Sequence, residues 1–375
     1  MWLFKSSIGR KFVMAVTGVC LVLFVTFHVL MNSVALIWPT AYNQVCEFLG
    51  ANWYALIASA GLGLLFIIHI VYAVWLTLQN RAARGNDRYA VTSRPPQVEW
   101  SSKNMLVLGI VILAFLAVHL VQFWAKMQWQ ELRHADLSVL PQLDGVPCGP
   151  AQGTLFLQLA FQNIWTPIVY IIGFIALWFH MTHGFWSMFQ TVGWDNARWL
   201  NRLKCIANWW TSIVIALFVA QTVVFTVHAH NDYYTENEAL QQQYAEYWNE
   251  QAKDLVQNFL EPLNAQVAPV MASAENGDMV AQMKAQQDIM AIQTQYISAN
   301  GPKFVENAQA VLDAFKKQCP KVAPGEEISR LGQFRAQIIS MLPQSMPSQP
   351  QGADAAAADA AQIQPEAQPE AQPQN

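Results

Sequence analysis

The stretch VTGVCLVLFVTFHVLMNSVALIW, residues 16–38, runs for 23 residues without Asp, Glu, Lys or Arg. About 20 apolar residues in a helix are enough to cross the roughly 30 Å of a bilayer's hydrocarbon core. Five apolar runs of this kind occupy residues 12–37, 53–78, 104–125, 166–189 and 206–229. We therefore expect an all-α integral membrane protein, a five-helix bundle formed by residues 1–230.

The composition agrees with this class. Of the 375 residues, 54% are apolar and only 12% are charged, which is unusual for a soluble protein of this length. The first apolar run is longer than the core of a signal peptide and lacks a clear cleavage site, so we interpret it as a retained span. We expect membrane lipid, and no nucleic acid, among the partners.

The basic residues between the runs indicate the orientation, because Lys and Arg are held on the cytoplasmic side during insertion. They cluster at the N-terminus and in the second and fourth connections: Lys5, Arg10, Lys11; Arg81, Arg84, Arg88, Arg94, Lys103; Arg198, Arg202 and Lys204. The other two connections carry only Lys126 and Arg133. The N-terminus is thus predicted on the cytoplasmic side of a bacterial cytoplasmic membrane, and everything after His230 in the periplasm.

Four of the five runs contain one deeply placed histidine each: His28, His69, His119 and His180. A helix rises about 1.5 Å per residue, so position along a span converts to depth. Spans one and three run in one direction and spans two and four in the other. His28 and His119 therefore share a level toward the outer face, and His69 and His180 share one toward the cytoplasm.

An ionisable side chain in hydrocarbon costs several kcal/mol unless it is paired or ligated. Two histidine pairs at matched depths suit two bis-histidine haems, in which neutral imidazoles from two helices bind opposite faces of the iron. The alternative is that each histidine is a polar residue bonded to a backbone carbonyl, Ser or Thr. We favour two haem b groups, ligated by His28 with His119 and by His69 with His180.

Other residues are less specific. His183 lies one turn after His180, and depth alone barely separates the two as ligands. The remaining histidines, His134, His228 and His230, are expected at the membrane interface. Arg10, Lys11, Arg94 and Lys103 could neutralise haem propionates, although ordinary anchoring at the inner interface is the favoured explanation for each. Small residues permit close approach of a helix or macrocycle at Thr17, Gly18, Gly61, Gly63 and Gly173.

The composition changes after about residue 231, where Gln, Ala, Glu and Asn dominate. Residues 231–340 show helix-compatible patterning, with breaks expected at Pro262, Pro269, Gly301, Pro302, Pro320 and Pro324. We expect a helical periplasmic extension there and a disordered Pro/Gln/Ala tail over 341–375. Cys46, Cys148 and Cys319 fall on the predicted outer side, where a disulfide such as Cys148–Cys319 could persist, but the sequence decides no pairing.

With these residues in view, residues 1 to about 230 resemble the dihaem cytochrome b subunit of succinate:quinone oxidoreductases, the membrane anchors of succinate dehydrogenase and fumarate reductase. The resemblance rests on the order of the spans and on four stretches: FHVLMN (27–32), IHIVY (68–72), VHL (118–120) and FHMTHGFWS (179–187). In the family's fourth-span pattern the ligand precedes a Gly-x-Trp-Ser run by a few residues, which assigns it to His180. The family also pairs the histidines as the depths do.

The resemblance implies partners and substrates. A flavoprotein subunit would act on succinate or fumarate, and an iron–sulfur subunit would dock on the cytoplasmic face. Two haems would connect its clusters to a quinone, menaquinone by analogy. This chain would then be an electron-transfer subunit with no dicarboxylate site of its own. Polar candidates for the quinone site are Asn32, Gln122, Gln158 and Asn163.

Two departures and two alternatives accompany the resemblance. Some fumarate-reducing relatives carry a proton-conducting Glu two residues before the fourth-span ligand, where this chain has Trp178. The extension has no counterpart in a typical member.

One alternative is a cytochrome b of a hydrogenase or formate dehydrogenase, which often places two ligands on one helix. The other is a transporter whose histidines relay protons, which predicts charged partners within the spans.

Overall fold

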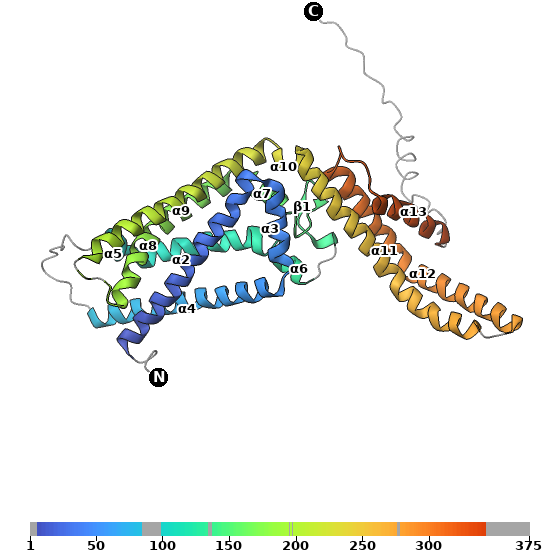
Figure 1. Cartoon of the computed structure of the whole chain (residues 1–375), viewed down its shortest axis with the longest axis horizontal. Coiled ribbons are helices and arrows are strands. Elements are labelled where there is room, and N and C mark those ends of the chain that lie inside the picture. Colours follow the sequence, from blue (N-terminus) through green and yellow to red (C-terminus); the bar gives the residue numbers. More distant parts are fainter. Residues whose placement is uncertain are drawn as a thin grey trace, which may run out of the picture. The chain divides into compact units, whose positions relative to one another are not determined.

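The computed structural model describes residues 6–84, 99–133, 137–194, 196, 198–275 and 278–342, and these are almost entirely helical (Figure 1). Five stretches are long and apolar enough to cross a membrane: Ser7–Ile37, Trp53–Ala83, Trp100–Trp124, Trp165–Thr191 and Trp199–His230. The expectation of five such helices is confirmed, and their orientation stays a prediction. Predictions concerning Lys5, Arg88, Arg94, His134 and residues 343–375 lie outside the described residues.

The first spanning helix, α2 (Ser7–Ile37), has defined ends. The Ser6 hydroxyl accepts a hydrogen bond from the Gly9 N–H at 2.9 Å, which caps the N-terminus. At the other end Trp38 leaves the helical conformation, and Pro39 begins a short helix, α3 (Pro39–Ala51). Proline suits a first helical position because it has no N–H to satisfy. The second spanning helix, α4 (Trp53–Arg84), follows α3 almost directly.

The third spanning stretch changes its winding at its end. Helix α5 (Trp100–His119) continues as a π-helical turn, η1 (Leu120–Trp124), in which the Ala125 N–H bonds to the Leu120 carbonyl at 2.8 Å. π-Helical turns are rare in proteins, and those that occur are often found at functional sites. The turn begins at the residue after His119, so it rotates the side chains that follow this histidine.

A folded connection joins α5 to the fourth spanning helix. It contains α6 (Gln128–Leu132), the 3-10 turn η2 (Leu137–Val139), strands β1 (Gln142–Leu143) and β2 (Val146–Pro147), and α7 (Gly153–Phe161). The two strands are antiparallel and are joined by Asp144 and Gly145, both with positive φ (51° and 76°). Asp-Gly is a preferred pair for this hairpin turn.

The spanning helices differ in how deeply they are packed. Helix α8 (Trp165–Thr191) contacts α2, α5 and α9 (Trp199–His230), and α2 also contacts α3, α4 and α9. In the most apolar 18-residue stretch of each span, 28% and 33% of the residues are buried in α8 and α9, but only 6% in α4 and in α5. Helices α4 and α5 are therefore peripheral, with apolar side chains left free to face lipid.

The described chain after α9 consists of α10 (Tyr233–Glu236), α11 (Glu238–Ala274), α12 (Met279–Gln318) and α13 (Glu326–Met341). Two compact units result. The first includes the spanning helices and continues through 256, with 307–332. The second consists of 257–306 and the residues from 333 onward.

A buried polar network fastens the extension within the first unit. Gln318 Oε1 accepts hydrogen bonds from Trp248 Nε1 (2.7 Å) and Gln152 Nε2 (3.3 Å), and Gln318 Nε2 donates to the Pro147 carbonyl (3.0 Å). Both hydrogen-bonding ends of this buried amide are satisfied, as a polar group out of water requires. The ends of α11 and α12 are thus integral to the fold around the α5–α8 connection.

The second unit has an aromatic core. Phe259 packs on Tyr296, Phe304 and Phe334 with ring centres 4.5–5.9 Å apart. The expected breaks at Pro262, Pro269, Gly301 and Pro302 are wrong, because α11 and α12 run through these positions. A proline removes one helical hydrogen bond, and tertiary packing of long helices can outweigh that loss. Of the expected breaks, only those at Pro320 and Pro324 lie outside helices.

Candidate functional site

The structure brings the four span histidines together as two pairs. His28 on α2 lies beside His119 on α5, with ring centres 5.7 Å apart and an interplanar angle of 86°. His69 on α4 lies beside His180 on α8, at 6.3 Å and 66°. We call these the first and the second pair. Each pair joins two separate helices, and no histidine belongs to both.

The separations suit a metal between the rings. A metal–nitrogen bond of about 2 Å on each side, plus about 1 Å from nitrogen to ring centre, puts two ligand rings roughly 6 Å apart. Among the described residues there is no group of three or more His, Cys, Asp or Glu that could hold a metal ion. A bis-histidine haem needs only two protein ligands, since the porphyrin supplies the other four nitrogens.

A chain of hydrogen bonds fixes the ring of His119. The Tyr170 hydroxyl donates to Gln122 Oε1 at 2.9 Å, so its oxygen accepts from Nδ1–H of His119 at 3.2 Å. Gln122 lies in the π turn, and its amide donates to Thr166 Oγ1 at 3.1 Å. With the proton on Nδ1, the His119 Nε2 lone pair is available to a metal, the usual state of a histidine ligand.

The second pair has a similar contact at His69. The Thr17 hydroxyl donates to the Val13 carbonyl at 2.9 Å, and its oxygen therefore accepts from His69 Nδ1–H at 3.1 Å. A Cβ placed on the neighbouring Gly18 would be 3.9 Å from His69 Cε1, in ordinary contact. Thr17 and Gly18, expected to allow close approach, thus lie against a candidate ligand. No atom lies within 4 Å of a Cβ placed on Gly61 or Gly63 in the described structure.

His28 is surrounded by one amide and several aromatic rings. The Asn32 amide lies 3.4 Å from its ring nitrogens and donates to its backbone carbonyl at 2.9 Å. Phe24 stacks on the ring at 5.4 Å, and Phe218 lies at 6.1 Å. An apolar aromatic wall is what a macrocycle in this position would need.

The His119 side of the first pair is packed tightly as well. Phe115 and Phe123 lie 6.1 and 5.3 Å from the His119 ring. Phe115 also packs on Gly173 of α8, where an added Cβ would be 2.5 Å from Phe115 Cγ. Gly173 therefore permits the approach of α5 and α8 that holds this ring, which is the role expected of it.

The structure gives His180 and His183 different surroundings, which distinguishes the two as candidate ligands. The His180 ring faces His69, and its buried Nδ1 has no hydrogen-bond partner among the described residues. His183 instead has Nδ1 3.2 Å from Glu99 Oε2. Glu99 also accepts from Lys204 Nζ at 2.8 Å. His183 belongs to this charged cluster, whereas His180 has the geometry of a ligand.

The charged cluster sets the protonation of Glu99. Partial burial acts to raise the pKa of this carboxyl, but hydrogen bonds and charges from Lys204 and His183 outweigh burial and lower it. Lys204 also lies 4.4 Å from the centre of the Trp186 ring, a cation–π contact. Glu99 is therefore a carboxylate at neutral pH, and it connects the starts of α5 and α9 with the end of α8.

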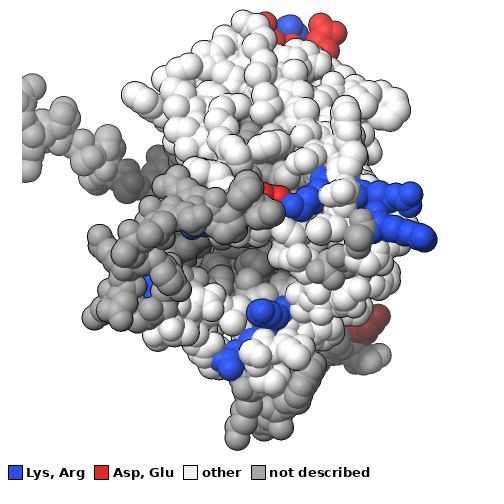
Figure 2. Space-filling model, turned by 90° about the vertical axis from the view of Figure 1, so that its left-hand side faces the viewer, with Lys and Arg blue, Asp and Glu red and all other residues white. Residues whose placement is uncertain are grey.

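Among the basic residues expected near haem propionates, Arg10 makes a cation–π contact. Arg10 lies over the Trp75 ring at 5.2 Å, an arrangement that suits an interfacial anchor as well as an anion site. Figure 2 shows Lys and Arg side chains standing out from a mostly uncharged surface at one end of the molecule. Of the other candidates for a propionate contact, Lys11 and Lys103 are among the described residues and Arg94 is not.

The remaining polar candidates make structural hydrogen bonds, although the buried Gln158 Oε1 has no partner among the described residues. Buried Gln158 donates to the Ala229 carbonyl at 2.7 Å, and Asn163 Oδ1 accepts from the Trp165 N–H at 3.0 Å at the start of α8. Trp178, two residues before His180, donates to Ser212 Oγ at 3.0 Å. Asn32 and Gln122 are thus the two quinone candidates that contact a span histidine or its hydrogen-bond chain.

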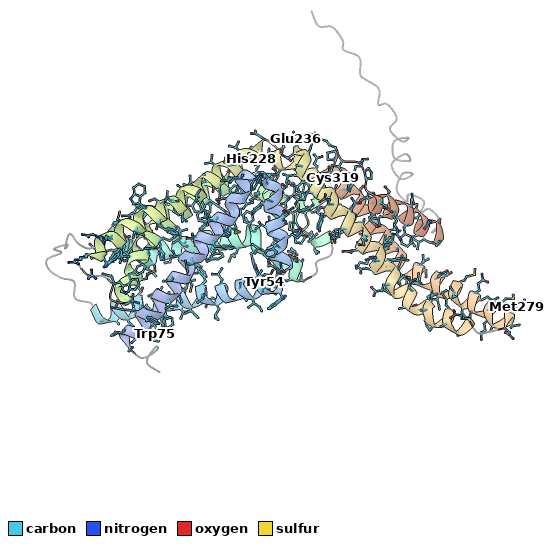
Figure 3. The ribbon with its side chains drawn as sticks, in the orientation of Figure 1. Tyr54, Trp75, His228, Glu236, Met279 and Cys319 are labelled. Atoms are coloured by element: carbon cyan, nitrogen blue, oxygen red, sulfur yellow. The ribbon has the colours of Figure 1, made fainter. Side chains whose placement is uncertain are left out.

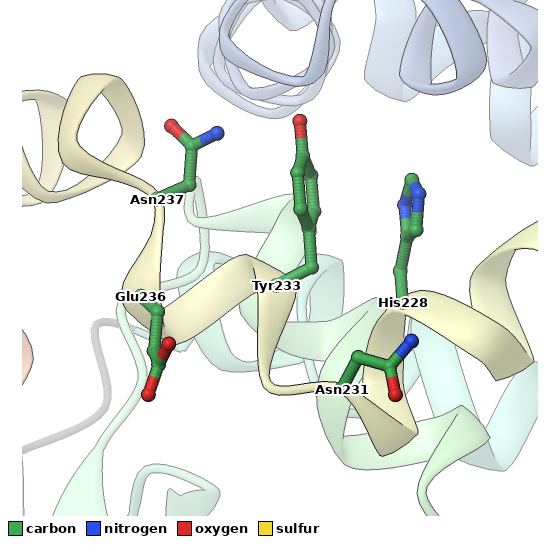
Figure 4. A pocket seen from close by; sticks show the side chains of 5 residues that line it. All are labelled: His228, Asn231, Tyr233, Glu236 and Asn237. Carbon is green, nitrogen blue, oxygen red and sulfur yellow. The ribbon is translucent and has the colours of Figure 1, made fainter.

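A pocket of about 280 Å³ lies where α9 ends, lined by His228, Asn231, Tyr233, Glu236 and Asn237 (Figure 4). The His228 and Tyr233 rings stack at 4.2 Å. Glu236 points to the opposite side of the chain from Tyr233 in this view. These polar groups do not converge on one point, so the pocket lacks the arrangement of a catalytic or metal site. His230 is exposed, as expected at an interface.

The cysteines form no disulfide: all five are free thiols. Cys148 and Cys319 are buried, and burial raises the pKa of each to about 12. Their thiolate forms are therefore scarce near neutral pH, and thiolates are the reactive species.

Sequence reasoning missed Tyr170 and Glu99. Tyr170 lies ten residues before His180, or about 15 Å along the helix. The depth argument applied to tyrosine could have placed it opposite His119. Comparison with protein-family models, curated proteins and solved structures gave no match to this chain.

Proposed function

We propose that this chain is the dihaem cytochrome b anchor of a succinate:quinone oxidoreductase, with one haem b held by His28 and His119 and a second by His69 and His180. The observation that carries the proposal is the pairing itself. Four histidines from four spanning helices meet as two pairs, with ring centres 5.7 and 6.3 Å apart. Unligated imidazoles in hydrocarbon would have little reason to be so arranged.

The surrounding residues support ligation. Tyr170 and Thr17 each accept the Nδ1 proton of one histidine, which leaves Nε2 directed to bind metal. The His180 ring faces His69, and no hydrogen bond to its buried Nδ1 ties it to another described residue, so it is available to pair with His69 about a metal. Haem b, when bound, takes up and releases one electron at a time.

The proposal extends to partners and location. In it the protein lies in the cytoplasmic membrane of a bacterium, and an iron–sulfur subunit with its flavoprotein docks where basic residues gather. The quinone, menaquinone by analogy, would be bound near Asn32 and Gln122. The extension would be periplasmic. Succinate or fumarate would react only on the flavoprotein, so this chain would be an electron-transfer and quinone-reactive subunit.

A pyridine haemochrome assay on the purified full chain tests the haem sites. We expect two haems b per chain. His28→Ala, His69→Ala, His119→Ala and His180→Ala should each lose at least one, because removal of one axial ligand weakens a bis-histidine site. His183→Ala is the matched control, since it lies on the same helix as His180 but in the charged cluster, and should keep two. A colourless, correctly folded preparation would refute the proposal.

The choice of complex needs a second measurement. Membranes containing the protein and its native partners should show reduction of the b-type bands by succinate and reoxidation by fumarate. Reduction by hydrogen or formate, with no response to succinate, would assign the chain to another quinone-linked complex and would leave the haem sites standing.

A further inference from the structure

The start of the extension is bonded to α3, the short helix that follows α2. Figure 3 shows Glu236, the last residue of α10, close to His228 near the end of α9, where the extension begins. Gln243, in the first turns of α11, contacts α3 twice. Its Oε1 accepts from Asn43 Nδ2 at 2.9 Å, and its Nε2 donates to the Thr40 carbonyl at 3.1 Å. Both ends of one side-chain amide therefore hold α3.

A second contact from α11 completes the bonding of Asn43. Asn43 Oδ1 accepts from the backbone N–H and the hydroxyl of Thr154 on α7, at 2.8 and 2.9 Å, and the Thr154 hydroxyl lies 2.7 Å from that of Tyr244. All three side chains are buried. An unmade hydrogen bond in such a place costs the full desolvation of the polar group, so these contacts are kept. The position of α3 is thus fixed by α7 and by the extension together.

The residue before Asn43 connects α3 to the first pair. The Tyr42 hydroxyl donates to Asn32 Oδ1 at 3.2 Å, so the amide nitrogen of Asn32 is directed to His28. That nitrogen donates to the His28 carbonyl at 2.9 Å and lies 3.4 Å from both ring nitrogens. Tyr42 is buried, and a Cβ placed on Gly153 of α7 would be 3.0 Å from its Cε1, so this ring has little room to move. Tyr42 therefore determines how Asn32 meets His28.

We propose that the extension positions the His28 ligand of the first pair. Its first turns hold α3 through Asn43, and α3 holds the Asn32 amide against the His28 ring through Tyr42. Groups that lie behind a metal-binding histidine orient its ring and set the strength of its bond to the metal. This role of the extension rests on the haem sites proposed above, and it concerns only one of them.

The second pair lies outside this chain of contacts. His69 bonds to Thr17 of α2. Thr17 comes 15 residues before Asn32, which is about 22 Å along the helix. A change in the first turns of the extension should therefore affect the haem of the first pair and leave the second unaltered, whereas a general loss of stability would affect both.

Transfer of haem from the full chain in detergent to a soluble haem scavenger provides the test. The haem of the first pair is identified as the one that His28→Ala removes. Tyr42→Phe should speed its transfer by about tenfold. Tyr244→Phe should speed it by about threefold, the effect of losing one modest hydrogen bond. Tyr296→Phe is the matched control, since it removes a hydroxyl bond to the Phe259 carbonyl within the second unit, and it should change neither haem.

The double variant Tyr42→Phe with Tyr244→Phe tests whether the extension acts through Tyr42. Once Tyr42 no longer holds Asn32, loss of the Tyr244 hydroxyl should have no further effect on the first haem, whereas independent sites would multiply their effects. Low-temperature EPR of the oxidised protein is a second readout, because the g values of a bis-histidine haem depend on the angle between its imidazole planes. Only the signal of the first haem should shift in the single variants.

The outcomes separate the two proposals. A wild-type chain that binds no haem would refute the proposed function, and the role of the extension with it. If two haems bind, three results would refute the role of the extension alone: no effect of Tyr244→Phe, an equal effect on both haems, or a multiplied effect in the double variant. Circular dichroism checks that the helices are intact. Gln243→Leu, which removes the other bonds from α11 to α3, carries the same expectation and replaces Tyr244→Phe if that variant does not fold.

Discussion

The two histidine pairs have similar ring separations but are held in different ways. In the first pair, His119 is oriented by a chain of three polar side chains, and aromatic rings pack on both histidines. In the second pair, His69 has one hydroxyl partner and His180 Nδ1 has none in the described structure. The first pair is therefore fixed by directional bonds, and the second depends more on packing.

Their electrostatic surroundings differ as well. The second pair lies one helical turn from the cluster of Glu99, His183 and Lys204. The partners of the first pair named above, Asn32, Tyr170 and Phe218, are uncharged or aromatic. We infer that, if both pairs bind metal as proposed, the protein distinguishes them by the residues that surround each ring and not by the ligands. Four substitutions probe this difference.

The largest effect is expected at Gly173, which affects only the first pair. In Gly173→Ala the new Cβ would be 2.5 Å from Cγ and 2.9 Å from Cβ of Phe115, and side-chain rotation cannot move that Cβ away. Overpacking of this kind destabilises by about 1–3 kcal/mol. We expect a lower Tm and loss of the haem of the first pair, with the second retained.

Gly184→Ala is the control for this substitution. It lies on the same helix, and nothing lies within 4 Å of its added Cβ in the described structure. Tm and haem content should be unchanged. Equal loss in both variants would show that α8 is generally sensitive to alanine and would remove the argument for a specific contact.

The second largest effect is expected from Tyr170→Phe. The variant keeps the ring but leaves His119 Nδ1–H and Gln122 Oε1 without their partner. Loss of a hydrogen bond behind a metal-binding histidine typically weakens metal binding about 10–100-fold. Transfer of haem to a soluble haem scavenger should be faster by that order. Trp178→Phe, which removes only the bond to Ser212, should leave the transfer rate unchanged.

The sequence predicts the two histidine pairs better than it predicts the residues that surround them. Regular rise along a helix is enough to place His28 level with His119, because depth depends only on residue count and direction. The contact of Tyr170 with His119 depends also on rotation about each helix axis. The π turn after His119 alters that rotation, and no pattern in the sequence marks it.

In the C-terminal extension, too, tertiary packing decides features that local sequence patterns cannot predict. Prolines within a polar, alanine-rich sequence predict breaks, but α11 and α12 continue through Pro262 and Pro302. The reason is tertiary: Phe259, Phe304 and Phe334 form a core that stabilises these helices. Burial of Trp248 against Gln318 likewise joins residues 70 positions apart, which local patterning cannot reveal.

A smaller effect is expected from Thr17→Val, which affects only the second pair. Valine has nearly the same shape, but His69 Nδ1–H would lose its acceptor. An unpaired buried donor costs about 1–3 kcal/mol, and the lower end applies because the rest of this pair is already held by packing. We expect haem transfer from the second pair to be faster by about tenfold or less. Thr77→Val on α4, whose hydroxyl donates to Ala73, should have no effect. Faster loss from the first pair instead would contradict the assignment of Thr17.

The smallest effect is expected from Glu99→Gln, which removes the charge behind the second pair. Glu99 is partly exposed, and ion pairs of this kind contribute about 0.2–1 kcal/mol. Because the pKa of Glu99 is lowered from its ordinary 4.5, its contribution should be complete above pH 4.5 and disappear as the pH falls through the lowered value. The Tm difference between wild type and variant should thus be small at pH 7 and vanish on acidification, with two haems present throughout. Glu327→Gln, which removes a long contact of 3.9 Å to the exposed Arg330, should shift Tm less. A Tm difference that persisted in acid would mean that Glu99 acts through packing, and the two pairs would then not differ in electrostatics.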